Sequence, residues 1–205
     1  MTTTRRNLLA AAISMIGYSS LARANSFFCA AGLPYDTKVY PIDLDDFEDL
    51  VHDGEIAEQE TPETCWAAAI HAKLVFHNVK VSQQEVFEHV KGKVGNKAGT
   101  GTLREIIKGL SPGANGWFVN TGDSKMLTSD LQAGNPVLAG LKQGGNSVGH
   151  VVVVYGVTAV ANLYTGQTFV DMIKYWDPAS GVGLVEESGC DFDKKLKFML
   201  HSWRP

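Results

Sequence analysis

The chain changes character at Pro136, because helical sequence signals come before it and strand signals come after it. The first half contains two capping boxes, Ser82 with Glu85 and Thr102 with Glu105, in which a hydroxyl and a carboxylate satisfy the first amides of a helix. The second half contains the run 148–156, whose continuous apolar character is typical of a strand buried on both faces. Helices followed by strands predict an α+β fold, with a helical layer packed on an antiparallel sheet.

The first helix is expected to have Thr61 as its N-cap and Pro62 at its first helical position. Gly109 is expected to stop the third helix. The expected helices cover about 61–78, 82–90, 102–109 and 126–132, and the expected strands cover 137–141, 148–156, 167–176, 183–187 and 197–201.

With 205 residues, 44% of them hydrophobic and 20% charged, the chain is long enough for one domain with a substantial core. Its formal net charge of -4 gives no indication of a nucleic acid or an anionic membrane as partner.

The first 24 residues have the pattern of a secretory signal peptide. Arg5 and Arg6 precede a moderately apolar run, and Ala22-Arg23-Ala24 is a small-residue cleavage pattern. The paired arginines followed by Asn-Leu-Leu resemble a bacterial twin-arginine export signal. An amphipathic N-terminal helix or a retained anchor is the alternative, but the run is shorter than the roughly 20 residues of a membrane span. We therefore expect a periplasmic or secreted protein that makes no membrane contact once residues 1–24 are removed.

Residues 25–58 are interpreted as an acidic lead-in to a domain that covers 59–205. The favoured interpretation is a strand and turn packed on the domain with a solvated acidic face, and the alternative is a segment that covers the active-site cleft. Ten of the chain's 22 acidic residues lie between positions 36 and 60: Asp36, Asp43, Asp45, Asp46, Glu48, Asp49, Asp53, Glu55, Glu58 and Glu60.

Cys65 is the candidate nucleophile. It lies near an expected helix start, where the helix dipole and unpaired amides favour the thiolate. Gln59 lies six positions upstream and Trp66-Ala67 follows directly. A buried structural cysteine is the common alternative, but the coincidence of these features favours a nucleophile. Gln59 is expected to donate its side-chain amide to an oxyanion, with the Cys65 backbone N–H as second donor.

His150 and Asp177 are the candidate partners of Cys65. His150 follows Gly149, which leaves room beside the ring for a substrate backbone. Asp177 precedes Pro178 at a strand end, and we expect it to accept the Nδ1 proton of His150 and so set the tautomer of the ring. Taken singly, the first could be a core histidine and the second an Asx turn.

No paired-histidine or Cys-x-x-Cys spacing indicates a metal, and no dinucleotide or Walker loop indicates a cofactor. The other two cysteines, Cys29 and Cys190, could form a disulfide that export permits, or they could be two buried or free thiols.

Together, Gln59, Cys65-Trp66-Ala67, Gly149-His150 and Asp177-Pro178 resemble the motifs of papain-like cysteine peptidases. The interval from Cys65 to His150 is shorter than in plant papains, and the third member is Asp rather than Asn. Both features are similar to compact bacterial members, namely avirulence-type effector proteases and double-glycine leader peptidases, and Trp66 favours the effector type. The resemblance implies a helical lobe that carries the cysteine and an antiparallel sheet lobe that carries the histidine and aspartate.

The resemblance also implies hydrolysis of a peptide or protein substrate by a thiolate–imidazolium pair. Two alternatives remain. A transglutaminase-like acyl transferase or deamidase shares the Cys-His-Asp order, although Gln59 at this spacing speaks against it. A catalytically silent peptidase fold that serves as a binding module is the other.

Overall fold

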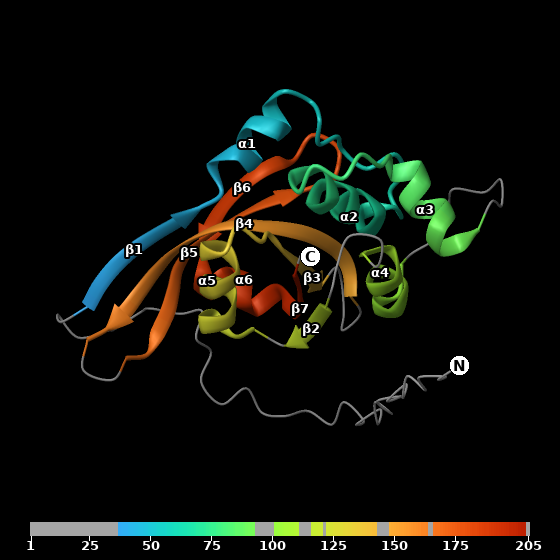
Figure 1. Ribbon diagram of the computed structural model, residues 1–205. Helices are drawn as coiled ribbons and strands as arrows, with labels where there is room; N and C mark the ends of the chain where they lie inside the picture. The colour runs from blue at the N-terminus through green and yellow to red at the C-terminus, as the bar shows by residue number, and fades with distance from the viewer. Residues whose placement is uncertain are drawn as a thin grey trace, which may run out of the picture.

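The computed structural model of the protein describes residues 37–92, 101–110, 116–120, 122–142, 148–163 and 166–203. Helices and antiparallel strands make up this part of the chain, as the sequence predicts (Figure 1). The helices are α1 Asp45–His52, α2 Cys65–Phe76, α3 Gln83–Lys91, α4 Leu103–Leu110, α5 Ser124–Gln132 and α6 Gly189–Lys195. The strands are β1 Thr37–Asp43, β2 Gly116–Asn120, β3 Val137–Lys142, β4 Val148–Asn162, β5 Thr168–Asp177, β6 Gly183–Ser188 and β7 Leu196–Trp203.

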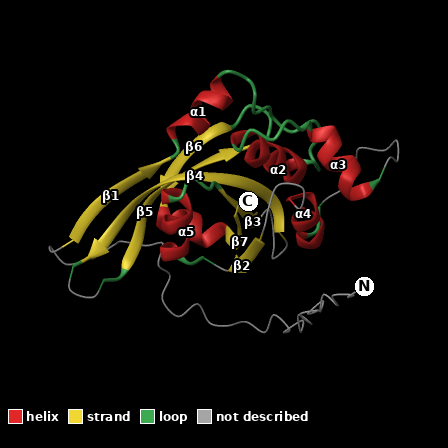
Figure 2. Cartoon of the chain, viewed as in Figure 1, coloured by secondary structure: helices red, strands yellow, loops and turns green. Residues whose placement is uncertain are grey.

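The strands form one sheet in the order β2-β7-β3-β4-β5-β6, and β1 also pairs with β4. Every pairing is antiparallel. The long strand β4 pairs with β3 along its first half and with β1 along its second half, while β5 lies on its other edge. Helices α2, α3 and α4 group at one end of the sheet, and β1, β4 and β5 extend away from them (Figure 2). The first residues of β4 therefore lie at the end of the sheet where these helices gather.

Helix α2 forms the centre of the core. It is apolar on all sides, which is typical of a buried helix, and it packs against β4 and β3. Helices α3 and α4 cover its outer side. The expectation that Gly109 stops α4 is wrong, because the helix continues to Leu110. A Cβ atom on Gly109 would lie 2.7 Å from Ile70 Cδ1, so glycine serves there as a close-packing position against α2.

Both predicted capping boxes are present. Ser82 Oγ accepts from the Glu85 amide, and the Glu85 carboxylate accepts from the Ser82 amide at 2.7 Å. Thr102 and Glu105 make the same exchange at the start of α4.

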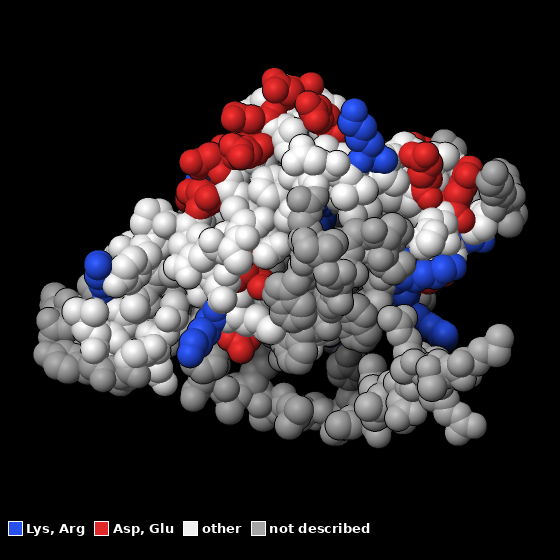
Figure 3. All heavy atoms as spheres, viewed as in Figure 1, with Lys and Arg blue, Asp and Glu red and all other residues white. Residues whose placement is uncertain are grey.

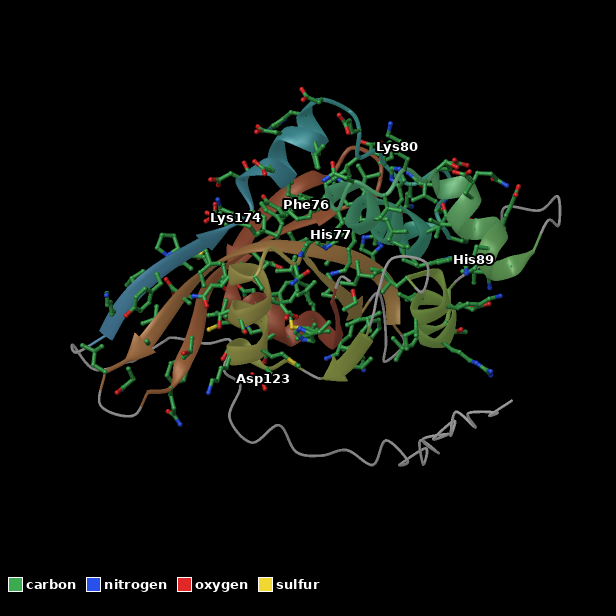
Figure 4. The ribbon with its side chains drawn as sticks, viewed as in Figure 1. Phe76, His77, Lys80, His89, Asp123 and Lys174 are labelled. Atoms are coloured by element: carbon green, nitrogen blue, oxygen red, sulfur yellow. The ribbon has the colours of Figure 1, made fainter. Side chains whose placement is uncertain are left out.

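The predicted N-cap Thr61 is wrong, since α2 begins at Cys65 and Thr64 is its N-cap. The Thr64 hydroxyl accepts from the Thr61 amide and donates to the Thr61 carbonyl, both at 3.0 Å. These two hydrogen bonds close a turn over positions 61–64, and Pro62 lies in that turn instead of in the helix. Helix α5 likewise begins two residues before the expected start, where Asp123 caps it by accepting from the Met126 amide (Figure 4).

The acidic segment contributes a strand and a helix to the domain. Strand β1 pairs with β4, and α1 buries Phe47, whose ring stacks on Tyr155 with centroids 5.2 Å apart. Acidic side chains gather on the outside of α1 (Figure 3). Helix α1 replaces the turn that was expected here; Phe47, Leu50 and Val51 have the i, i+3, i+4 spacing of a helix. Neither α6 nor β2 was expected. The boundary at residue 59 stays a prediction.

Candidate active site

Cys65 is the first residue of α2 and is 6% exposed. The first amides of a helix have no partner inside the helix, and the dipole makes this end electropositive. Trp66 fixes the helix start: its indole is buried and its ring centroid lies 5.8 Å from that of Phe87. A Cβ atom on Gly101 would lie 2.4 Å from Trp66 Cγ, so the chain before α4 lies directly on the indole. The sulfur is thus held at an electropositive, tightly packed position.

His150 reaches Cys65 from the sheet. It is the third residue of β4 and lies opposite Leu141 in β3. Its ring interacts with the Cys65 side chain, which helps to raise the pKa of His150. Its Nε2 lies 2.6 Å from Oδ1 of Asp177, the last residue of β5. The expectation that Asp177 would bond Nδ1 is wrong. With Nε2 directed at the neighbouring strand β5, Nδ1 is the nitrogen left for the sulfur.

The electrostatics of His150 favour a charged ring. Burial by itself lowers the pKa of His150, but hydrogen bonds to Asp177 and Cys65 and the negative charges of these two groups outweigh it and raise the pKa to about 9. The His150 and Asp177 side chains are only 14% and 16% exposed, so solvent screens their interaction weakly. An imidazolium at neutral pH is the state that supports a neighbouring thiolate.

Asp177 has two roles in the structure. Its Oδ1 accepts from the Ala179 amide at 2.8 Å, which is the Asx turn considered as an alternative. The same oxygen bonds His150 Nε2. The two interpretations of Asp177 are therefore compatible, because the turn orients the carboxylate that the histidine meets.

Gln59 lies beside this turn. Its backbone amide donates to the Pro178 carbonyl at 2.8 Å, one residue beyond Asp177. Its side-chain Oε1 is buried and accepts no hydrogen bond within the part of the chain that the structure describes. The structure thus ties the backbone of Gln59 to the turn that follows the His150 partner.

Some predicted features lie partly or wholly outside the described residues. Residues 1–24 and Cys29 do so entirely, so the signal peptide and the Cys29–Cys190 pairing stay predictions. Cys190, in α6, is disulfide-bonded, whereas Cys65 is a free thiol. None of the helices described is both long and apolar enough to span a bilayer.

Sequence reasoning missed one polar residue next to the site. Gln83, the first residue of α3, donates its side-chain amide to the carbonyls of Ala57 and Glu58, both at 2.9 Å. Only the capping box at Ser82 indicated anything at this position. No local pattern links it to a loop about 25 residues upstream.

A model of the Peptidase C39 like family matches residues 52–200. No match is found among curated proteins. Among solved structures, the peptidase domain of Streptococcus ComA, a bifunctional ABC transporter involved in a quorum sensing pathway, is 18% identical with a TM-score of 0.55; the match covers 73% of this chain and 97% of that one. A double glycine motif protease from an AMS/PCAT transporter, in complex with its leader peptide, is 16% identical with a TM-score of 0.51 and coverages of 73% and 91%. These two solved structures are of the leader-peptidase type, which is one of the two compact bacterial types that the sequence resembles and is not the type that Trp66 favoured.

Proposed function

This chain belongs to the peptidase C39-like family and has a papain-like cysteine peptidase fold, and on that premise we propose that it hydrolyses peptide bonds with Cys65, His150 and Asp177. One observation carries the proposal: His150 Nε2 lies 2.6 Å from the Asp177 carboxylate, and the same ring interacts with Cys65 at the start of α2. A histidine that served only to fill the core would not need a thiol at a helix N-terminus on one side and a carboxylate from a neighbouring strand on the other.

The proposed mechanism begins with the Cys65 thiolate, which attacks the peptide carbonyl and forms a C–S bond. The Gln59 amide and the Cys65 N–H stabilise the resulting oxyanion. His150 donates its proton to the leaving amine as the C–N bond breaks. Water, deprotonated by His150, then attacks the thioester, and as the C–S bond breaks the carboxylic acid leaves and the Cys65 thiolate is restored beside the protonated His150. Asp177 keeps the ring oriented and charged during the first half of this cycle.

The proposed substrate is a peptide. A structurally similar double glycine motif protease has been solved in complex with its leader peptide. A peptide with a Gly-Gly pair is therefore the first substrate to test on this protein, with a Gly-Ala counterpart as its matched control.

We also propose that residues 1–24 direct export of the protein and are then removed, because Arg5, Arg6 and the Ala22-Arg23-Ala24 pattern occur in the order of an export signal. N-terminal sequencing of the exported protein should then give a chain that starts at Asn25. A double Arg5→Lys, Arg6→Lys variant should stay unprocessed, and normal processing of that variant would exclude the twin-arginine route.

The active-site proposal is tested by mild reduction followed by iodoacetamide at about pH 6, with the label located by peptide mass. We expect rapid labelling of Cys65, because a thiolate–imidazolium pair reacts at a pH where an ordinary thiol does not. His150→Ala should slow labelling by at least roughly tenfold, since the ion pair is lost. His89→Ala, an exposed histidine of α3, is the matched control. Equally slow labelling in all three proteins would contradict an activated nucleophile.

A further inference from the structure

Gln83 is a buried polar residue that the proposed mechanism does not use. It is 7% exposed, and its Nε2 donates to the carbonyl oxygens of Ala57 and Glu58, each at 2.9 Å. A side-chain amide has two N–H donors, so both are used. Its Oε1 is buried and has no hydrogen-bond partner among the described residues. Burying an oxygen without a partner costs stability, and an apolar side chain at position 83 would avoid that cost. The favourable contribution of the Gln83 amide is therefore its two donated hydrogen bonds.

The segment that Gln83 holds leads directly to Gln59. Residues 57–59 belong to no helix or strand, so regular hydrogen bonding does not fix them. Their second attachment is the turn that follows Asp177. The Gly181 amide donates to Glu58 Oε1 at 2.9 Å, and the Gln59 amide donates to the Pro178 carbonyl at 2.8 Å. The segment is thus held from α3 on one side and from the Asp177 turn on the other.

We propose that Gln83 is a positioning residue for the oxyanion hole, acting through the backbone of residues 57 and 58 on the side chain of Gln59. The inference rests on the proposed function, because it takes Gln59 as an oxyanion donor. An oxyanion hole works only if its donors are already in place when the charge forms, and a displacement of about 1 Å costs on the order of 10²-fold in rate. The two hydrogen bonds from Gln83 to the carbonyls of residues 57 and 58, called the Gln83 clamp, hold the irregular loop that carries Gln59 in place.

Two probes of Cys65 separate this role from a general structural one. Acylation by p-nitrophenyl acetate forms an S–C bond at a carbonyl, passes through an oxyanion and expels p-nitrophenolate. Alkylation by iodoacetamide displaces iodide at a saturated carbon, so it forms no oxyanion and reports only on the reactivity of the sulfur. Neither probe requires knowledge of the peptide substrate. Cys65→Ala supplies the background rate for both.

The variant is Gln83→Met, which has a similar length and no donor. We expect its acylation rate constant to fall by about 10- to 100-fold, with the alkylation rate within about twofold of the parent protein. Gln83→Asn keeps both N–H donors on a shorter side chain, so its acylation rate constant should fall by less than that of Gln83→Met. Gln84→Met is the matched control, because Gln84 is on the same helix and, among the described residues, its side chain bonds Glu88 of that helix at 2.6 Å. Gln84→Met should match the parent protein with both probes.

A double variant decides whether Gln83 acts through Gln59. In a Gln59→Ala background, Gln83→Met should cause little further loss of acylation, because the donor that it positions is gone. The positioning role would be overturned if Gln83→Met lowered the acylation rate constant as much in the Gln59→Ala background as in the parent protein. It would also be overturned if Gln83→Met lowered the alkylation rate constant to the same extent as the acylation rate constant. If the parent protein is alkylated rapidly but acylated no faster than a small free thiol, the oxyanion hole itself is absent and the inference fails with it. If the parent protein reacts slowly with both probes, it is the proposed nucleophile that fails.

Discussion

His150 keeps its proton at a pH where an isolated histidine would lose it. Its pKa of about 9 lies above the ordinary 6.5 because the Asp177 and Cys65 interactions outweigh burial. The folded protein therefore binds this proton more tightly than the unfolded chain does. The resulting stabilisation is fully present below about pH 6.5 and is lost as the pH rises through about 9.

Replacing the carboxylate by an amide should show how much of this shift comes from charge. Asp177→Asn keeps an oxygen for His150 Nε2 and for the Ala179 amide but removes the negative charge. We expect the midpoint of the His150 titration, followed by NMR of labelled histidine, to move down by roughly one to three pH units. Asp171→Asn, an exposed carboxylate on the same strand, should leave it near 9. An unchanged midpoint in Asp177→Asn would show that Asp177 does not hold the ring charged.

At the scale of elements, α2 is fixed at both ends. Cys65 meets the sheet through His150 at its start. Lys73 is buried near its other end, where Nζ donates to the Pro136 carbonyl just before β3. Asp130 of α5 attracts the same ammonium and lies 2.6 Å from Nδ1 of His201, in β7. This polar cluster of Lys73, Asp130 and His201 joins the nucleophile helix to α5 and to the sheet.

Lys73 should make stability depend on pH. Burial lowers its pKa from 10.5 to about 7, against the opposing attraction of Asp130. The unfolded chain therefore holds this proton more tightly, and the contribution of Lys73 to the free energy of unfolding should rise between about pH 7 and 10.5, opposite in sign to that of His150. Lys73→Met should remove that rise, as measured by urea unfolding across this range. Lys80→Met is the control, because Lys80 is exposed on the loop after α2 (Figure 4). Equal slopes in the two variants would contradict a buried, easily deprotonated lysine.

At the scale of the whole molecule, the cysteines divide into two kinds. Cys190 is disulfide-bonded and Cys65 is free. A free Cys65 is what the proposed nucleophile requires, and a disulfide is compatible with the proposed export. We propose that Cys29 is the partner of Cys190. This bridge would join the start of the proposed mature chain to α6. Such a bridge stabilises a fold by restricting the unfolded state.

Alkylation of the denatured mature protein without reductant tests this distribution. We expect one label, on Cys65, and three labels after reduction. Cys29→Ser should release Cys190 as a second unreduced thiol, because its predicted partner is gone. Three labels without reductant would exclude the disulfide, and an unchanged single label in Cys29→Ser would assign Cys190 to another partner.

The features that the sequence predicted correctly are those that neighbouring residues decide. Capping boxes at Ser82 and Thr102 depend on groups three residues apart, and the apolar run in β4 needs only its own composition. The α+β class follows from the order of such signals. The turn at Asp177 is also local, because Pro178 follows it directly.

Most of the features that local sequence patterns did not predict depend on contacts between residues far apart in the chain. The start of α2 is an exception, because it depends on the local Thr61–Thr64 turn, and both threonines are acceptable caps by composition alone. Which nitrogen of His150 meets Asp177 depends on the pairing of β4 with β5. By itself the sequence thus determined most of the helices and strands, without α1, β2 and α6, and the chemical groups of the candidate site. Only the tertiary structure decided their geometry, because the Gln83 clamp and the Lys73 cluster join segments that are far apart in the chain.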